Sequence, residues 1–507
     1  MQPGVDRRAF AFFPTIDPAA YPDTGYDQPH RPQFHFCSKR NWLNDPNGMV
    51  FDGRRFHLFF QHNPLGTEWG NMTWGHATSD DMVHWRQQDH ALLPYMLGKQ
   101  AGTIFSGTAV VDHNDSLGLQ TGETKTLAAF FTFATKPRFY QAMAYSLDRG
   151  ETWTYHNDGR PVVENQGFDA GERDPKVFWH EPSGQWVMVL WVQRAADAKD
   201  DRPATRGRVR IFTSDNLTDW EFASDLMRDW AYECMDVVFL PVDGDTDNVK
   251  CVFYDASFDY EVGEFDGTRF TNIEPTRKLG RGNFYAAQTF NSMPDSLGLP
   301  GDRPGRCVQI GWMQGGPNSA DAYGTPHNQQ MAFPCDLTLR TENDGLKLCA
   351  YPIPEIERIE RDVTRFDRVD IAANAKPLQT PPLDLVDVSL TLEPGDAAVV
   401  TIDLPQVSLA YDAATGTLRV GPDAKQVLFT GMPPRDGRID LRVLVDRLSV
   451  EAYAFGGEQF GALYIDPRTG PTTFPRLAAT GGNAIATDVV VRRLNSIWPN
   501  ADDAADD

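Results

Sequence analysis

A short pattern that recurs at a fixed interval constrains the fold more than any other feature of the sequence. A serine, a polar turn and a tryptophan follow one another at residues 79–85, 146–153 and 214–220, and the serines lie 67 and 68 residues apart. Apolar residues precede each copy, so each predicts a strand, a turn and an aromatic side chain that packs at the start of the next strand. Residues 263–267 resemble a degenerate fourth copy. Such a period predicts radial or linear repetition of one structural unit.

The composition of the repeat favours a β-propeller over a helical solenoid, because its strands are short, its turns carry Gly and Asp, and helical patterns are few. At roughly 65 residues per blade, residues 30–350 would hold about five blades, within the usual range for propellers. The alternative is that three similar turns arose by chance in a β-rich protein. A chain of 507 residues also exceeds one ordinary core, so a second domain is expected.

The second half of the chain predicts a separate β-sandwich. Short alternating apolar runs at 386–392, 399–404, 418–420, 439–453 and 485–494 are separated by turns. The predicted organisation is therefore all-β: a five-bladed β-propeller followed by a C-terminal β-sandwich. The expected boundaries are a propeller at 28–352, a connector, part helix and part loop, at 353–375, a sandwich at 376–498 and a disordered acidic tail at 499–507.

Charge and composition exclude several classes of partner. The net charge of −23 argues against nucleic acid and anionic membranes, which need a positive surface. The apolar runs are too short to span a bilayer. The start of the chain matches a secretory signal poorly, so we expect a cytoplasmic protein, or a secreted one if the start is processed or truncated. Six single cysteines without a CxxC pair predict free thiols, no disulfide framework and no zinc site.

Three carboxylates stand in surroundings that suggest chemistry. Asp45 lies in a Trp-Leu-Asn-Asp-Pro-Asn-Gly run, Asp174 in Arg-Asp-Pro, and Glu233 in Tyr-Glu-Cys. The separations of 129 and 59 residues are close to two blades and one blade, so equivalent positions would converge on the propeller axis. Two carboxylates that flank a glycosidic bond can cleave it. Clustering raises the pKa of such acids and keeps one protonated near neutral pH.

The neighbours of these acids support the same interpretation. Arg173 is placed to hold Asp174 ionised, and four tryptophans can stack on sugar rings: Trp42, Trp69, Trp74 and Trp312. Each feature also has an ordinary explanation, as a turn, a surface ion pair, a strand-edge charge or core packing. Histidines form no metal-spaced pair near the acids, so no metal is expected. It is the combination at blade spacing that indicates a glycosidase.

At these residues the chain closely resembles glycoside hydrolase family 32, the invertases, exo-inulinases and levanases. The likeness extends over nearly the whole chain, and its motifs follow the family's order. The matching motifs are Gln33–Phe36, Asn44–Gly48, Gln61–Pro64, Trp69–His76, Phe105–Val110, Arg173–Pro175, Glu233–Cys234, Phe284–Gln288, Gly311–Met313 and, in the second domain, Asp446–Glu451.

The resemblance implies a five-bladed propeller with a C-terminal sandwich and a retaining β-fructosidase. By this likeness, Asp45 is the nucleophile, Glu233 the acid/base and Asp174 the stabiliser of the transition state. No metal or cofactor is implied, and the substrate is sucrose, levan or inulin; residues 310–340 look more like exo-acting bacterial levanases. The residues expected to bind the terminal fructose are Asn44, Gln61, Trp69, Phe105, Ser106, Arg173 and Trp312.

Three other functions remain open from the sequence: a fructosyltransferase, an inverting five-bladed hydrolase similar to arabinanases, and an inactive carbohydrate-binding relative. Carboxyl separations of about 5–5.5 Å for retention and 6.5–9.5 Å for inversion would distinguish the hydrolases. For the sandwich, a sugar-binding module and a stabilising partner of the propeller are the alternatives. The oligomeric state is not predicted.

Overall fold

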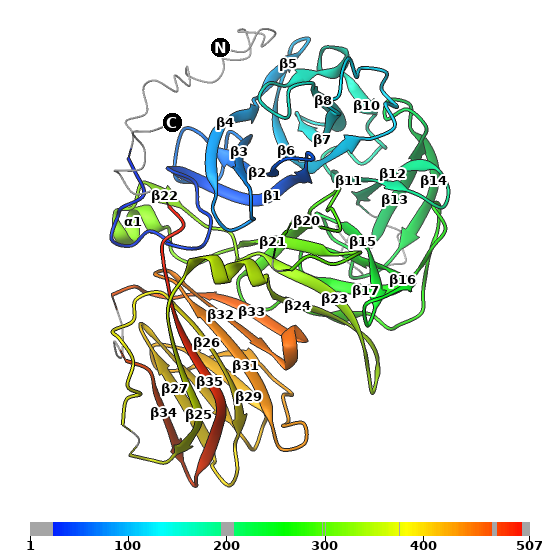
Figure 1. Ribbon diagram of the computed structural model, residues 1–507. Helices are drawn as coiled ribbons and strands as arrows, with labels where there is room; N and C mark the ends of the chain where they lie inside the picture. The colour runs from blue at the N-terminus through cyan, green and yellow to red at the C-terminus, as the bar shows by residue number, and fades with distance from the viewer. Residues whose placement is uncertain are drawn as a thin grey trace.

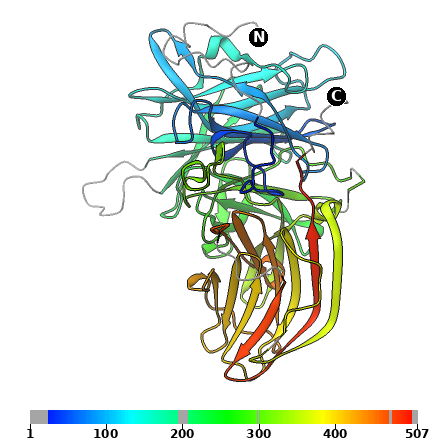
Figure 2. The same cartoon turned by 90° about the vertical axis from the view of Figure 1, so that its left-hand side faces the viewer.

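The computed structural model describes residues 24–193, 207–296, 298–299, 301–374, 376–468 and 474–498. Its strands form two bodies, a ring of sheets and a two-sheet sandwich (Figure 1). Figure 2 shows the same two bodies from the side, with the sandwich strands running roughly along the long direction of the molecule. The acidic tail predicted at 499–507 lies outside the described residues.

The ring consists of five antiparallel units, which are the predicted blades. Their innermost strands face the centre, and several of them contact one another there. These strands are β1, β6, β11, β15 and β20. The fourth and fifth units share one sheet, because Val242 pairs with Leu339. The strands are, unit by unit, β1 (Asn41–Phe51), β2 (Phe56–Asn63), β3 (Thr73–Ser79), β4 (Arg86–Leu92) and β22 (His327–Asn328); β5 (Tyr95–Leu97), β6 (Gln100–Asp112), β7 (Thr126–Ala134), β8 (Phe139–Ser146), β9 (Thr154–Tyr155) and β10 (Pro161–Val163); β11 (Glu172–His180), β12 (Gln185–Val192), β13 (Arg208–Ser214) and β14 (Glu221–Met227); β15 (Asp236–Val242), β16 (Asp245–Tyr254), β17 (Asp259–Phe265), β18 (Phe270–Asn272) and β19 (Arg277–Lys278); β20 (Phe284–Thr289), β21 (Cys307–Met313), β23 (Cys335–Glu342) and β24 (Gly345–Pro352).

The sequence repeat is the turn after the third strand of a blade. In the first three blades its tryptophan donates an indole N–H to a backbone carbonyl three residues earlier: Trp85 to Met82 at 3.0 Å, Trp153 to Gly150 at 3.1 Å and Trp220 to Leu217 at 3.0 Å. The degenerate copy at 263–267 covers the end of β17 and the start of the turn to β18. The prediction of a propeller from this repeat is confirmed.

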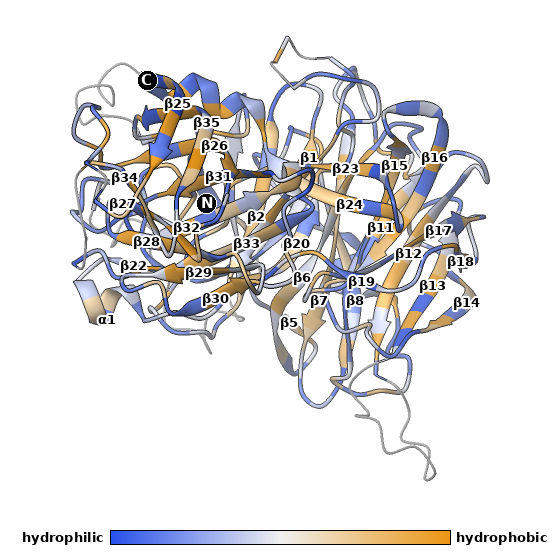
Figure 3. Cartoon of the chain, turned by 90° about the horizontal axis from the view of Figure 1, so that it is seen from below, coloured by the Kyte–Doolittle hydropathy of each residue, from blue (hydrophilic) through white to orange (hydrophobic). Residues whose placement is uncertain are grey.

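The sandwich packs two sheets, in the strand orders β25-β35-β26-β31-β32-β33 and β30-β29-β28-β27-β34. Alternating side chains from both sheets fill its own core, and Figure 3 shows hydrophobic colour along the strands of both domains. Its strands are β25 (Glu360–Ile371), β26 (Val386–Glu393), β27 (Val399–Leu404), β28 (Val407–Asp412), β29 (Thr417–Gly421), β30 (Gln426–Phe429), β31 (Ile439–Val445), β32 (Ser449–Ala454), β33 (Gln459–Tyr464), β34 (Arg476–Thr480) and β35 (Ala484–Leu494).

The connector expected at 353–375 is shorter than predicted. Only residues 354–359 form a helical turn, the 3-10 helix η4 (Pro354–Ile359), which buries Ile356 and Ile359. Residues 360–371 are strand β25, which pairs along its length with β35 (Figure 1). The helical part of the connector ends at residue 359, because Val363 already lies in this edge strand and is 41% exposed.

The two domains share a continuous interface. One hydrophobic core includes Met331 and Phe333 from the propeller together with Tyr453 and Phe460 from the sandwich. A parallel bridge joins residue 282, just before β20, to residue 462 in β33. All six cysteines are free and buried, as predicted. In the described part of the chain, no helix is long and apolar enough to cross a bilayer.

Candidate active site

The inner strands of four blades each carry a bulge at the same end of the ring. The register shifts lie between Leu43 and Pro46 in β1, 104 and 107 in β6, 173 and 176 in β11, and 285 and 288 in β20. Bulges re-aim side chains and are common beside active sites. Two of them contain an Asp-Pro pair, and proline favours a bulge because it cannot donate to the strand ladder. The bulged segments contain Asn44, Asp45, Phe105, Ser106 and Asp174, all predicted site residues.

An unusual backbone conformation also sets the direction of the acidic side chains. Asp174, Glu233 and Cys234 have φ of 65°, 31° and 43°, in the left-handed region that non-glycine residues seldom occupy. Each such residue costs on the order of 1–3 kcal/mol and persists only where its surroundings hold it. Here the Asp174 N–H donates to the Thr132 hydroxyl at 2.9 Å, and the Cys234 N–H donates to Asp174 Oδ2 at 3.1 Å.

Two acids from the first and third blades and one from the connection to the fourth blade meet in one cluster. The Cys234 thiol lies 3.5 Å from Asp45 Oδ2 and 3.4 Å from Asp174 Oδ2. The Arg173 guanidinium donates to Glu233 Oε2 at 3.0 Å and 2.8 Å and lies 3.8 Å from Asp174 Oδ2. The structure thus joins residues that are 129 and 59 positions apart in the chain.

Each oxygen of Asp45 has its own donor. Ser106 Oγ donates to Oδ2 at 2.6 Å, and the Asn44 side chain donates to Oδ1 at 3.1 Å. Asn44 is held in turn by the indole N–H of Trp42 at 2.8 Å. The Asp45 carboxylate therefore has a fixed orientation.

The remaining predicted binding residues surround this cluster. Trp69 is 58% exposed and meets Phe105 edge-on, with ring centroids 5.9 Å apart. Gln61 lies in β2 opposite the bulge of β1, and among the described residues its side-chain nitrogen has no hydrogen-bond partner. Trp312 is the strand partner of Tyr285. Trp74, by contrast, is fully buried in the core and is not placed to stack on a sugar.

Burial and nearby charges together change the pKa values of the carboxyl groups. Burial raises the pKa of Asp45, against the hydrogen bond from Ser106, and the nearby Glu233 raises it further. Burial likewise raises the pKa of Asp174, and the Arg173 guanidinium only partly offsets this. Solvent reaches the cluster at Glu233 and Arg173, whose side chains are 20% and 19% exposed. Asp45 and Asp174 therefore keep their protons to higher pH than exposed aspartates do.

Comparison with known proteins identifies the family. Residues 35–352 match the model of the glycosyl hydrolases family 32 N-terminal domain. The chain belongs to glycosyl hydrolase family 32. The resemblance found in the sequence is thereby confirmed, and this family 32 protein is a glycosidase.

Relatives and solved structures agree with the family assignment. A levanase of Bacillus subtilis is 34% identical over 512 residues, covering 93% of this chain and 72% of the levanase. The extracellular exo-inulinase inuE of Aspergillus ficuum is 32% identical over 540 residues, covering 93% and 96%. The crystal structure of exo-inulinase from Aspergillus awamori, 29% identical, superposes with a TM-score of 0.76 over 94% of this chain and 100% of that one. The predicted propeller with a C-terminal sandwich is therefore confirmed.

Residues that the sequence did not assign to the site complete it. Tyr285 donates its hydroxyl to Glu233 Oε1 at 2.7 Å. Gln329 accepts the indole N–H of Trp312 at 3.2 Å, and Tyr464 of the sandwich donates to the Met313 carbonyl at 2.8 Å. The motif at 284–288 gave a signal for Tyr285. No local pattern points to Gln329 or Tyr464, because their roles arise from contacts between distant segments.

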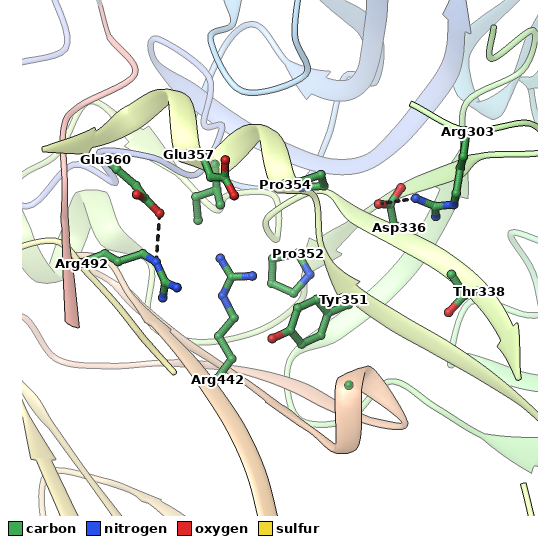
Figure 4. Close-up of a pocket in the computed structure, with 12 residues that line it drawn as sticks. Arg303, Asp336, Thr338, Tyr351, Pro352, Pro354, Glu357, Glu360, Arg442 and Arg492 are labelled. Atoms are coloured by element: carbon green, nitrogen blue, oxygen red, sulfur yellow. Dashed lines mark hydrogen bonds and ion pairs between the residues drawn. The ribbon is translucent and has the colours of Figure 1, made fainter. Parts of the chain in front are cut away.

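A separate cleft of about 340 Å³ lies between the domains, beside β24, η4 and the sandwich (Figure 4). Several of its charges are already paired, such as Arg492 with Glu360 at 3.0 Å and Arg303 with Asp336 at 3.2 Å. None of the predicted site residues lines it. In the described part of the chain, no group of three or more His, Cys, Asp or Glu side chains is arranged to hold a metal ion.

Proposed function

We propose that this family 32 glycosidase releases terminal fructose from β-fructofuranosides, with sucrose, levan or inulin as substrates, and retains the anomeric configuration. The observation that carries the proposal is the meeting of Asp45, Asp174 and Glu233 around Cys234 and Arg173. The levanase and exo-inulinases among the relatives support a fructan substrate.

In the first step Asp45 attacks the anomeric carbon of the terminal fructose. Its oriented carboxylate supports this role. The bond from that carbon to the glycosidic oxygen breaks while Glu233 gives its proton to the oxygen, so a fructosyl ester on Asp45 and a free leaving alcohol result. In the second step ionised Glu233 takes a proton from water as the water attacks the same carbon. The ester bond to Asp45 breaks, fructose is released, and Asp45 becomes a carboxylate again.

Asp174 acts without forming a bond to the sugar. Its Oδ2 accepts the Cys234 N–H and lies beside Arg173, and these two contacts favour its charged form against the burial that raises its pKa. From there it binds sugar hydroxyls and stabilises the positive charge that develops on the ring. The residues around the bulges bind the same sugar: Asn44, Gln61, Trp69, Phe105, Ser106, Arg173 and Trp312.

The roles of the two reacting carboxyls are tested with two variants and two substrates. Glu233→Gln is expected to lower kcat on sucrose by about 10²–10⁴-fold, the usual contribution of a general acid. Fructosyl fluoride needs no proton on its leaving group, so it should restore much of the first step in Glu233→Gln but not in Asp45→Asn. Normal sucrose hydrolysis by Asp45→Asn would contradict the assignment of the nucleophile.

The stereochemistry and the acceptor are tested on the wild-type enzyme. Proton NMR during early turnover should show β-fructofuranose as the first product from sucrose, inulin or levan. The α anomer would indicate inversion and contradict the fructosyl-enzyme intermediate. Longer oligosaccharides as the main product from concentrated sucrose would show that transfer, and not hydrolysis, is the principal reaction.

A further inference from the structure

Tyr464, at the end of β33, extends from the sandwich to the segments beside the candidate active site. Its hydroxyl donates to the Met313 carbonyl at 2.8 Å and lies 3.3 Å from Gln329 Oε1. The same Gln329 oxygen accepts the indole N–H of Trp312 at 3.2 Å. The Gln329 carboxamide oxygen thus lies between the hydroxyl of a sandwich tyrosine, whose single proton is shared between this oxygen and the Met313 carbonyl, and the indole of a predicted fructose-binding tryptophan.

The backbone around Tyr464 is fixed to the same blade. Its N–H donates to Asn283 Oδ1 at 3.1 Å, and the Asn283 N–H donates to the Ala462 carbonyl at 2.7 Å. The ring packs closely over Gly316, where a Cβ would lie 2.4 Å from it. Tyr464 therefore has little freedom to move independently of the fifth blade.

Two aromatic residues next to the acids, Tyr285 and Trp312, lie on the strands that Tyr464 contacts. Tyr285, two residues after Asn283, donates to Glu233, and Trp312 is its strand partner across β20 and β21. Trp312 also meets Trp42 edge-on, with ring centroids 6.0 Å apart, and Trp42 holds Asn44. A shift of Trp312 would therefore move Trp42 and, with it, Asn44, which donates to Asp45.

We propose that Tyr464 is a positioning residue for fructoside binding: the sandwich, through the Tyr464 hydroxyl and Gln329, fixes the indole of Trp312 in the wall of the site. This goes beyond the two roles considered for the sandwich, a sugar-binding module and a stabilising partner. It rests on the proposed function, because Trp312 is assigned there to the terminal fructose. Tyr464 itself need not touch the sugar.

The test replaces Tyr464 by Phe, which keeps the ring over Gly316 and removes the hydroxyl. We expect the KM for sucrose and the inhibition constant of fructose to rise about 3- to 10-fold, the effect of losing one shared neutral hydrogen bond, while kcat stays within about twofold. The matched control is Tyr411→Phe, since that buried sandwich hydroxyl also donates to a methionine carbonyl, Met432, at 2.8 Å. The control should lose similar stability and keep its KM.

A double-mutant cycle with Trp312→Phe identifies the route. Without the indole N–H, adding Tyr464→Phe should change KM by less than about twofold, because the two side chains act through one contact. If the fold-changes in KM of the two single variants multiply in the double variant, the proposal is overturned. An unchanged KM in Tyr464→Phe, or an equal rise of KM in Tyr411→Phe, would overturn it as well. If Tyr464→Phe does not fold, Gln329→Leu removes the shared acceptor and must raise KM in the same way. A wild-type protein that releases no fructose overturns the proposed function as well, whereas an active wild type with an unaffected variant overturns this inference alone.

Discussion

At the scale of single residues, Arg173 contacts two of the three acids. It pairs with Glu233, lies beside Asp174 and stacks over the Trp191 ring, with its guanidinium carbon 4.5 Å from the ring centroid. Burial alone would lower the pKa of Arg173, but Asp174 and Glu233 raise it, so it stays charged. Lysine cannot replace Arg173, because its ammonium lacks the planar guanidinium that contacts two acids and an aromatic ring at once.

Replacing Arg173 should therefore change the pH dependence as well as the rate. In Arg173→Gln the positive charge that lowers the pKa of Asp174 is lost, so this carboxyl protonates at higher pH. We expect the acidic limb of the kcat/KM profile to move to higher pH and the maximum to fall by about 10²-fold or more. Arg173→Lys keeps the charge and should shift the limb less. An unshifted acidic limb in Arg173→Gln would mean that Asp174 does not control it.

Among the elements, strand β6 shows how a bulge and a glycine place a side chain. Gly107 follows Ser106, its N–H donates to Asn47 Oδ1 at 3.3 Å, and its carbonyl accepts from Gln288 at 2.8 Å. A Cβ on Gly107 would lie 1.9 Å from the carbonyl oxygen of Phe130 in β7. Only glycine allows the two strands to approach this closely beside the bulge.

Gly107→Ala should consequently weaken both the fold and the chemistry. Pushing β6 away from β7 is expected to cost about 1–3 kcal/mol of the free energy of unfolding. Because Ser106 moves with the strand and its hydroxyl orients Asp45, kcat/KM should fall by up to about 10²-fold. The control is Gly122→Ala, where an added Cβ meets nothing within 4 Å. Denaturant unfolding and sucrose kinetics measure both effects, and a fully active Gly107→Ala would contradict this account.

At the scale of the whole molecule, a buried ionic contact joins the two domains. Asp446 of the sandwich accepts the backbone N–H groups of Gln33, Phe34 and His35 at 2.8–3.1 Å and the His35 ring nitrogen at 2.9 Å. Glu451 lies 3.4 Å from the other ring nitrogen. Burial alone would lower the pKa of His35, but these two carboxylates raise it to about 9. The Asp446–Glu451 motif thus secures the segment before the propeller to the sandwich.

This contact predicts a pH-dependent stability. A histidine whose pKa rises from 6.5 to about 9 on folding stabilises fully below pH 6.5, and the contribution is lost as the pH rises through about 9. A shift of this size corresponds to roughly 3 kcal/mol. The pKa of Asp446 is lowered from 3.8, so its contribution disappears as the pH falls below that value. Between pH 6.5 and 9 the free energy of unfolding should fall more steeply in the wild type than in His35→Gln; parallel curves would contradict a charged His35.

Removing Asp446 tests the same contact directly. Asp446→Asn leaves a buried imidazolium without its closest partner, which should cost about 3–5 kcal/mol. Asp423→Asn, at an exposed carboxylate that pairs with the exposed Lys425, is the matched control and should be close to neutral. Equal stability of the two variants in denaturant unfolding would show that Asp446 does not hold the domains together.

The sequence predicted the fold because the fold depends on local chemistry repeated in register, and the blade spacing predicted that Asp45, Asp174 and Glu233 would converge. Each Ser-to-Trp turn closes its own hydrogen bonds, and each Asp-Pro pair favours a bulge in the strand that contains it. The connector was predicted too long, because β25 becomes a strand only by pairing with β35, which lies more than 100 residues later.

By itself, then, the sequence determined the repeated blade, the alternating sandwich strands and the residue types at the bulges, since neighbouring atoms are sufficient to favour each. Only the tertiary structure decided that Cys234 lies between two carboxylates, that Trp74 is core, and that the Tyr464 hydroxyl lies beside Gln329, which accepts the indole N–H of Trp312. Those contacts join segments tens to hundreds of residues apart, and closure of the ring and docking of the sandwich bring them within hydrogen-bonding distance.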